Sequence, residues 1–378
     1  MSSSSGRIDA LLASKSYVDR IVEDKELGGM KCLLLDGFTT KIVTTAYSQT
    51  QILEKEVYLV EALGKPHEPM LHMKAAVFVQ PTAANIAHLV KEVRAPRYAE
   101  YHLFFTNVVP HDLLVQLGKA DEKEVVKQVQ EFYADYLPVN EDLYHLGLDS
   151  GIVRAAKVNQ ALGKIGLVEN HTKGILAFLL SMKRRPRDVR YQAKSLVCRK
   201  VAEKIHQHLH SDDLFHFRQV EEPILLILDR RDDPVSPLLT QWTYQAMVHE
   251  LLGLKDNRVI LRGAPGVNPD MHEIVLSSTQ DAFYSQQRFA NFGDLGVSVK
   301  TLMDDYQKRS KMNENISSVQ DMQAFLDRYP QFRSKSINVS KHVALIGELA
   351  GDPGCLKLPV AAHFGLQLAK LDCRLKQL

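Results

Sequence analysis

A run of five apolar residues that ends in a cluster of charges is the sequence feature that most constrains the fold of this chain. Residues 224–228 read Ile-Leu-Leu-Ile-Leu, which is the length and composition of a buried parallel strand. The charged residues that follow are Asp229, Arg230, Arg231, Asp232 and Asp233. A helical pattern then runs from Leu238 to Leu252 and stops at Gly253, as expected of a glycine at a helix C-terminus. The pattern predicts an α/β fold in which a buried strand leads into a charged corner.

The residues alone leave two interpretations of this charged corner open. Carboxylates at the C-terminal end of a strand often take part in metal or phosphate chemistry, so Asp229, Asp232 and Asp233 could serve a metal-dependent hydrolase. Alternatively, Arg230 pairs with these carboxylates, and the corner braces a junction between domains whose core includes Trp242.

Motifs that carry catalysis or hold a phosphate are sparse in this sequence. It contains neither a GxGxxG nor a GxxxxGK[ST] loop, and neither a GxSxG elbow nor an HExxH pair. Residues 33–36, Leu-Leu-Leu-Asp, resemble the start of an aspartate-nucleophile phosphatase, but Phe38 stands where a second aspartate would help protonate the leaving group. Three histidines, His206, His208 and His210, could suggest a zinc site. Only His206 and His210 share a helical face, and this pattern fits a solvated helix end better than a zinc site. Outside the charged corner, these motifs therefore indicate no catalytic residue, no bound metal and no cofactor.

The composition is that of an ordinary globular protein. At 378 residues, with 45% hydrophobic and 24% charged residues, the chain is long enough for two or three domains. A formal net charge of +2 gives no global field that would attract nucleic acid. The longest apolar runs are too short to cross a bilayer, and the N-terminal residues lack an apolar signal segment. We expect a cytoplasmic protein that reaches membranes through a protein partner, without direct membrane insertion.

Short apolar runs alternate with helical patterns over the first third of the chain. The runs that predict strands lie at 32–35, 42–43, 57–60, 75–79 and 102–105. Helical patterns lie at 8–22, ended by Gly28 and Gly29, and at 84–93, with Thr82 as the N-cap. This alternation predicts a doubly wound, Rossmann-like parallel sheet in a first domain at residues 1–138.

The rest of the chain divides into regions of different character. Residues 139–237 combine helical patterns at 159–183 and 191–209 with the strand at 224–228, and so predict the first part of an α/β second domain. Residues 238–350 are mainly helical. Their helical segments lie at 297–309, 319–326 and 339–349. We expect a partial third domain there.

The segment from Leu225 to Gly253 resembles the signature of the Sec/Munc (SM) family, the cytosolic partners of SNARE proteins in membrane fusion. Within it, Trp242 to Leu251 is similar to the branch that serves trans-Golgi and endosomal syntaxins. The resemblance covers residues 15–350. It implies a non-enzymatic protein that binds a syntaxin-type SNARE and its SNARE complex, and that supports vesicle docking and fusion in traffic from the trans-Golgi and endosome to the vacuole or lysosome. It also implies a peripheral place on Golgi and endosomal membranes through SNARE partners.

The resemblance implies a shallow apolar pocket on the outer face of the first domain, which takes the N-terminal peptide of the syntaxin. The matching positions are Leu114, Leu117, Val126, Val129 and Glu131. Taken singly, Leu117, Val126 and Val129 are as readily ordinary core residues. Leu114 is more telling, because a helix cannot easily bury both Leu113 and Leu114.

Further sites follow from the same resemblance. A central cleft that cradles the syntaxin would include Asp36, Ser48 and Glu61. The corner at Asp229, Arg230, Asp232 and Asp233, with Trp242, would brace the junction of the second and third domains without a catalytic role. A helical hairpin that contacts the vesicle SNARE would bend at Tyr329, Pro330 and Phe332, because proline removes a helix donor.

The resemblance stops after Gly347-Glu348-Leu349. In the SM family a segment from the far C-terminus completes the second domain, so we expect this domain to be incomplete here. Residues 351–378 are expected to be an aberrant tail, arising from a gene-model or frameshift artefact or from a short isoform. A non-functional truncated fragment is a further alternative.

Overall fold

The computed structural model describes residues 8–66, 68–148, 166–211, 213–218, 222–239, 241–261, 272–314 and 337–350. The chain divides into two compact units, residues 1–230 and 231–378. The division falls between Arg230 and Arg231, inside the charged corner. Within the described ranges, no helix has both the length and the apolar character needed to cross a bilayer.

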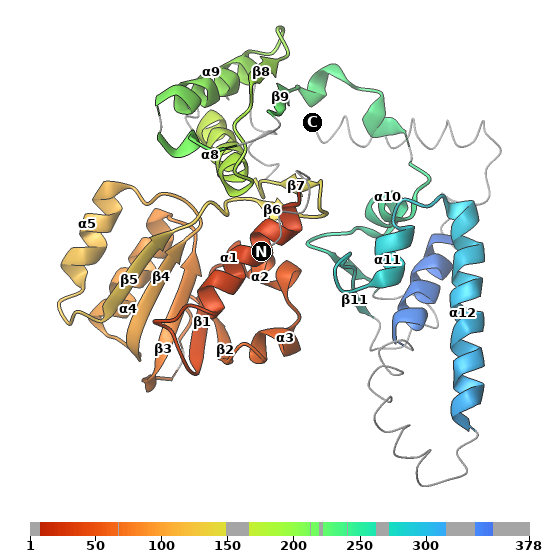
Figure 1. Ribbon diagram of the computed structural model, residues 1–378, viewed down its shortest axis with the longest axis horizontal. Coiled ribbons are helices and arrows are strands. Elements are labelled where there is room, and N and C mark those ends of the chain that lie inside the picture. The colour runs from red at the N-terminus through yellow and green to blue at the C-terminus, as the bar shows by residue number, and fades with distance from the viewer. Residues whose placement is uncertain are drawn as a thin grey trace. The chain divides into compact units, whose positions relative to one another are not determined.

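A five-stranded parallel sheet forms the centre of the first unit (Figure 1). Its strands are β1 (Lys31–Leu35), β2 (Val57–Ala62), β3 (Met70–Val79), β4 (Tyr98–Phe105) and β5 (Val126–Glu131). They lie in the order β2-β1-β3-β4-β5, and every neighbouring pair is parallel. The predicted parallel sheet is therefore confirmed.

Helices cover both faces of this sheet. One layer holds α1 (Ala10–Val22), α2 (Thr39–Ala46) and α3 (Gln49–Leu53), and the other holds α4 (Ala83–Arg94) and α5 (His111–Ala120). Alternate residues of β1 enter opposite cores: Leu33 and Leu35 pack with the first layer, whereas Cys32 and Leu34 pack with the second. Burial on both faces explains why the central strands are continuous apolar runs instead of alternating ones.

Two predictions for this region were wrong. Residues 42–43, predicted as a strand, lie in α2, where Ile42 and Val43 form the buried stripe of an amphipathic helix. The Asp36 carboxylate accepts backbone N–H groups just before α2, which starts a helix there. The first helix ends at Val22, well before the glycines at 28 and 29, because the chain turns so that Leu27 reaches the core.

The remainder of the first unit is built from short strands and two long helices. Its elements are β6 (Leu137–Pro138), β7 (Tyr144–His145), α8 (Gly166–Ser181), β8 (Asp188–Tyr191), α9 (Leu196–Ser211), η1 (Asp213–Phe215) and β9 (Ile224–Ile227). The division between the two units falls within η2 (Arg230–Asp232). β6 and β7 pair antiparallel, and β8 and β9 pair parallel. The predicted strand at 224–228 is present as β9, but its predicted burial was wrong, because Ile224 and Leu226 are 47% and 58% exposed. Its partner β8 was not predicted from the sequence.

The second unit mixes helices with a small hairpin. It contains η3 (Ser236–Leu238), α10 (Tyr244–Met247), the π-helical turn η4 (Val248–Leu252), the antiparallel strands β10 (Arg258–Ile260) and β11 (Glu273–Val275), α11 (Ala282–Gln287), α12 (Phe292–Glu314) and helical residues 337–350. The helical segments predicted at 297–309 and 339–349 are confirmed, whereas the one at 319–326 lies outside the described residues. Gly253 ends η4 with a φ of +84°, as predicted for a C-terminal glycine.

Candidate protein-interaction surfaces

The strand register gathers the predicted pocket residues on one face of the sheet. Val129 pairs with Leu103 and Glu131 with Phe105, so each pair shares a side of the sheet. Leu103 and Phe105 belong to the core under α4 and α5. α5 packs on this core, and α5 and β5 lie at the same outer edge of the sheet (Figure 1). We define the α5–β5 surface as Leu114, Val126, Val129 and Glu131, with Leu117 beneath them.

Exposure differs sharply among these residues. Leu114 and Val129 are 38% and 42% exposed, so two apolar side chains reach the surface with the core beneath them. Leu117 is only 2% exposed and packs in the core, so it supports this surface from below. Leu113 is half-buried while Leu114 is exposed, which confirms that the helix does not bury both.

One carboxylate of the α5–β5 surface is held in place by the backbone. The Glu131 side chain accepts a hydrogen bond from the backbone N–H of Val109 at 2.7 Å, and Val109 lies just before α5. The side chain is otherwise exposed. An apolar patch beside a fixed negative charge can bind a peptide that carries a bulky apolar side chain.

Asp36, the first predicted cleft residue, organises the carboxyl ends of β1 and β3. One carboxylate oxygen accepts from the backbone N–H groups of Phe38 and Thr39, at 2.9 and 2.7 Å. The other accepts from the Gln80 backbone N–H at 2.8 Å and from the Asn85 side-chain amide at 2.7 Å. Because these bonds satisfy both oxygens, Asp36 shapes the loops that follow the strands.

The other two predicted cleft residues form local contacts of their own. Ser48 is the N-cap of α3 and forms a capping box with Gln51. Glu61 accepts a hydrogen bond from the Tyr98 hydroxyl at 3.1 Å. Burial, together with nearby Cys32 and Glu61, raises the pKa of Tyr98. Asp36, Ser48 and Glu61 therefore belong to three separate contact networks.

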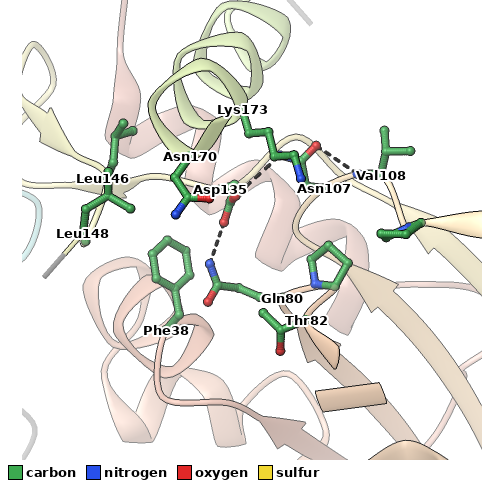
Figure 2. A pocket seen from close by; sticks show the side chains of 13 residues that line it. Phe38, Gln80, Thr82, Asn107, Val108, Asp135, Leu146, Leu148, Asn170 and Lys173 are labelled. Carbon is green, nitrogen blue, oxygen red and sulfur yellow. Dashed lines mark hydrogen bonds between the residues drawn. The ribbon is translucent and has the colours of Figure 1, made fainter. Parts of the chain in front are cut away.

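A pocket of about 320 Å³ opens above the carboxyl ends of β1, β3 and β4, next to α8 (Figure 2). Its lining residues are Phe38, Gln80, Pro81, Thr82, Asn107, Val108, Pro110, Asp135, Leu146, Gly147, Leu148, Asn170 and Lys173. Figure 2 shows the Gln80 amide directed at Asp135, to which it donates at 2.7 Å. Asp135 also accepts weaker bonds from Thr106 and Asn107.

The chemistry of this pocket suits polar contacts. Among the lining residues that the structure describes there is no serine, cysteine or histidine, and the Asp135 carboxylate accepts hydrogen bonds from Gln80 and Thr106. Sequence analysis missed this pocket, although the sequence held a signal. Gln80 and Asn107 each closely follow a predicted strand, and parallel strands bring their carboxyl ends to one edge.

The charged corner is tied to the start of α9. The Asp229 carboxylate accepts a hydrogen bond from the Ser195 hydroxyl at 2.6 Å, and the Asp229 N–H donates to the Gln192 side chain at 2.8 Å. The Ser195 hydroxyl in turn accepts from the N–H of Cys198 in the first turn of α9. A carboxylate near a helix N-terminus is stabilised by the helix dipole. Asp229 therefore links the end of β9 to the start of α9 through hydrogen bonds.

The neighbouring predictions have mixed outcomes. Asp233 accepts from the Ser236 N–H at 3.1 Å, and no group of three potential metal-ligating side chains converges in the described part of the chain. Trp242, expected in a core, is instead 43% exposed. The predicted hairpin bend at Tyr329, Pro330 and Phe332, and the tail at 351–378, lie outside the described residues.

Comparison with known proteins agrees with the fold. The Sec1 family model matches residues 31–352. Over 344 residues the chain is 43% identical to vacuolar protein sorting-associated protein 45 of Dictyostelium discoideum, covering 91% of this chain and 60% of that protein. The corresponding protein of Saccharomyces cerevisiae is 36% identical over 346 residues, covering 90% of this chain and 59% of that protein. The chain thus spans about 60% of the length of these relatives.

Solved structures show the same relationship. The SM protein Vps45 in complex with the Qa SNARE Tlg2 matches with a TM-score of 0.83 and 43% identity, over 91% of this chain and 62% of that one. A structure of the SM protein Vps45 matches with a TM-score of 0.80 and 39% identity, over 98% of this chain and 65% of that one. The family model covers most of the chain, and both structures share its fold. This chain belongs to the Sec1 family.

Proposed function

We propose that this chain binds a syntaxin-type Qa SNARE and supports SNARE assembly for vesicle docking and fusion between the trans-Golgi, endosome and vacuole or lysosome. The observation that carries the proposal is the 43% identity to an SM protein whose structure is a complex with a Qa SNARE. In this proposal the protein acts by binding, without catalysis, and reaches its membranes through its SNARE partners. The predicted domains at 1–138, 139–237 and 238–350 are part of the same proposal.

The α5–β5 surface is the proposed contact for the N-terminal segment of the SNARE. Its exposed apolar residues, Leu114 and Val129, offer a place for a bulky apolar anchor on the peptide. Burying one such anchor contributes about 1.5–3 kcal/mol. The Glu131 carboxylate, fixed by the Val109 N–H, would favour a peptide with a basic residue beside the anchor.

A charge placed on the α5–β5 surface tests this contact. In Leu114→Arg, a guanidinium would oppose the apolar anchor, and we expect affinity for the N-terminal peptide of the cognate syntaxin to fall at least tenfold, about 1.4 kcal/mol. The fold should survive, because Leu114 is already 38% exposed. The measurement is titration of a fluorescent peptide into the whole chain, with circular dichroism of each variant.

The neighbouring residue supplies a matched control. Val115 is 39% exposed on the same helix and is turned about 100° further from the buried stripe, away from Leu117. Val115→Arg should bind the peptide as the wild type does. Equal affinity in all three proteins would remove the α5–β5 assignment, and a failure of the wild type to bind any syntaxin peptide would count against this binding mode.

A further inference from the structure

A second concave site lies on the first unit, beside the C-terminal end of α4. It has a volume of about 670 Å³. Its lining residues are Gly64, Lys65, Pro66, Pro69, His88, Lys91, Glu92, Ala95, Pro96, Arg97 and Lys123. We call this site the basic pocket, because four of these side chains are cations and only one is a carboxylate. The volume is within the range of small-molecule sites.

The carboxylate and one cation of the basic pocket form its buried wall. Glu92 is buried and accepts bonds from Arg97 through both Nε and Nη2 of the guanidinium. The Tyr101 hydroxyl donates to the same carboxylate at 2.8 Å. Bidentate pairing raises the pKa of Arg97 and neutralises the Glu92 charge. The remaining positive charge therefore belongs to the three lysines.

The loop that carries Lys65 is fixed against this wall. Arg97 donates through Nη1 to the Lys65 backbone carbonyl at 3.3 Å. Gly64 has a φ of +83°, and a Cβ there would lie 2.6 Å from the His88 ring, so only glycine allows this close approach. Three prolines, at 66, 69 and 96, restrict the rim. The pocket is therefore organised before any ligand binds.

The three lysines come from three different segments. Lys65 follows β2, Lys91 lies in the last turn of α4, and Lys123 is in the tight turn before β5. All three side chains are exposed. Lys91 also complements the dipole at the C-terminus of α4, but that effect does not account for the lysines contributed by the two loops. Glu68, Glu122 and Glu124 are close in sequence, but none of them lines the pocket.

We propose that the basic pocket binds a polyphosphorylated headgroup, an inositol phosphate that is either free or part of a lipid. Three lysines that line one small volume suit a compact ligand with several phosphates, and basic pockets between helices hold such headgroups. An extended acidic peptide would instead require cations along a groove. The proposal does not depend on SNARE binding.

Neutralising the lysines tests the proposal. The whole chain is titrated by calorimetry with inositol hexakisphosphate, as wild type and with Lys91→Gln and Lys123→Gln combined. We expect saturable wild-type binding that weakens as salt is added, and at least a tenfold loss in the double variant. Lys194→Gln with Lys200→Gln removes two exposed lysines outside the pocket and should bind as the wild type does.

Vesicle flotation then separates the two sources of the headgroup. Lysine-dependent binding to vesicles of phosphatidylcholine and phosphatidylinositol bisphosphate, but not to phosphatidylserine vesicles of equal charge, would identify a lipid. Binding of the soluble compound alone would identify a free inositol phosphate. The proposal fails if the wild type shows no saturable binding, if the control pair loses as much affinity as the pocket pair, or if a polyglutamate peptide binds as tightly.

Discussion

The cores of the two units differ in kind. In the first unit the sheet is packed by apolar side chains on both faces, with residues such as Phe78 and Phe104 wholly buried. In the second unit the apolar core surrounds a buried polar chain of Tyr244, His342 and Asp281. The sheet core around Phe78 and Phe104 depends on shape and volume, with its buried charge in the Glu92 pair at the edge of the second layer, whereas the core of the second unit is built around hydrogen bonds and charge.

The polar chain of the second unit joins three helices. His342 lies 2.9 Å from an Asp281 oxygen through Nε2 and 2.8 Å from the Tyr244 hydroxyl through Nδ1. Lys341 also pairs with Asp281, and the Tyr284 N–H donates to it at the start of α11. A neutral His342 satisfies every partner, because Nε2–H donates to Asp281 while Nδ1 accepts the tyrosine hydroxyl.

This difference predicts how each core fails. An apolar core loses stability in proportion to the volume removed, because neighbouring side chains relax only partly. A buried polar network loses more than one contact when a single member changes, since the remaining groups are left without partners in a low-dielectric interior. Substitutions and acid should therefore act differently on the two units.

The largest effect is expected in the sheet. Phe104 is wholly buried and stacks on Phe132 at 5.7 Å, so Phe104→Ala should cost about 3–5 kcal/mol of unfolding free energy. The loss should be nearly the same at about pH 7 and about pH 5, because no charge is removed. Amide hydrogen exchange across β3 and β4 measures it. Val115→Ala, at an exposed site, should change stability by less than about 0.5 kcal/mol; an equal loss there would break the comparison.

A smaller but more specific loss is expected in the second unit. Asp281→Asn keeps the shape and removes the charge that pairs with Lys341, which should cost about 1.5–3 kcal/mol. Exchange should rise in α11 and in residues 337–350, with β3 and β4 unchanged. Glu273→Gln removes an exposed pair with Arg258 and should cost at most about 1 kcal/mol. If both variants lose the same amount, burial of the network is not what matters.

Acid should weaken the second unit before Asp281 takes up a proton. Burial lowers the pKa of His342 below its ordinary value of about 6.5, so the unfolded chain binds the extra proton first. Stability then falls as the pH drops below about 6.5, by at most about 1.4 kcal/mol per pH unit. Although burial alone would raise it, the pKa of Asp281 is held low by His342 and Lys341, so its contribution is lost in a second window as pH falls through the ordinary carboxyl range.

The matching variant is His342→Gln, which cannot take up a proton. Between about pH 7 and about pH 5, the free energy of opening of α11 should change less in this variant than in the wild type, although the variant is less stable at neutral pH. If the free energy of opening of the wild-type second unit, taken from exchange rates corrected for the intrinsic pH dependence of amide exchange, is the same at both pH values, His342 does not titrate in this range.

The same contrast explains how much of the fold the sequence predicts. Runs such as 75–79 and 102–105 are buried on both faces, so their composition alone indicates strands. β8, β10 and β11 have three or four residues each, with exposed positions, and only β10 and β11 contain an apolar pair, so the local pattern did not distinguish them from loops. Residues 42–43 show the converse error. Their β-branched side chains indicated a strand, but they form the buried face of a helix.

The candidate sites follow the same logic. The exposure of Leu114 was predictable, because two adjacent leucines cannot both face the core of one helix. The basic pocket was not, because Lys65, Lys91 and Lys123 come from segments that only the folded chain brings together. The Asp281–His342 contact spans 61 residues, and neither residue belongs to a local motif.

The smallest predicted effect concerns a polar contact in the first unit that is exposed. Thr82 caps α4 by accepting the Asn85 N–H at 3.2 Å, so Thr82→Ala should cost about 1 kcal/mol. Exchange should rise in the first turn of α4 only, and equally at both pH values, because the cap carries no charge. Thr44→Ala, at an exposed position inside α2, should be neutral or slightly stabilising, since alanine is the better helix former. If Thr82→Ala instead loosened the whole sheet, the first core would depend on polar contacts as the second does, and the distinction between the two units would not hold.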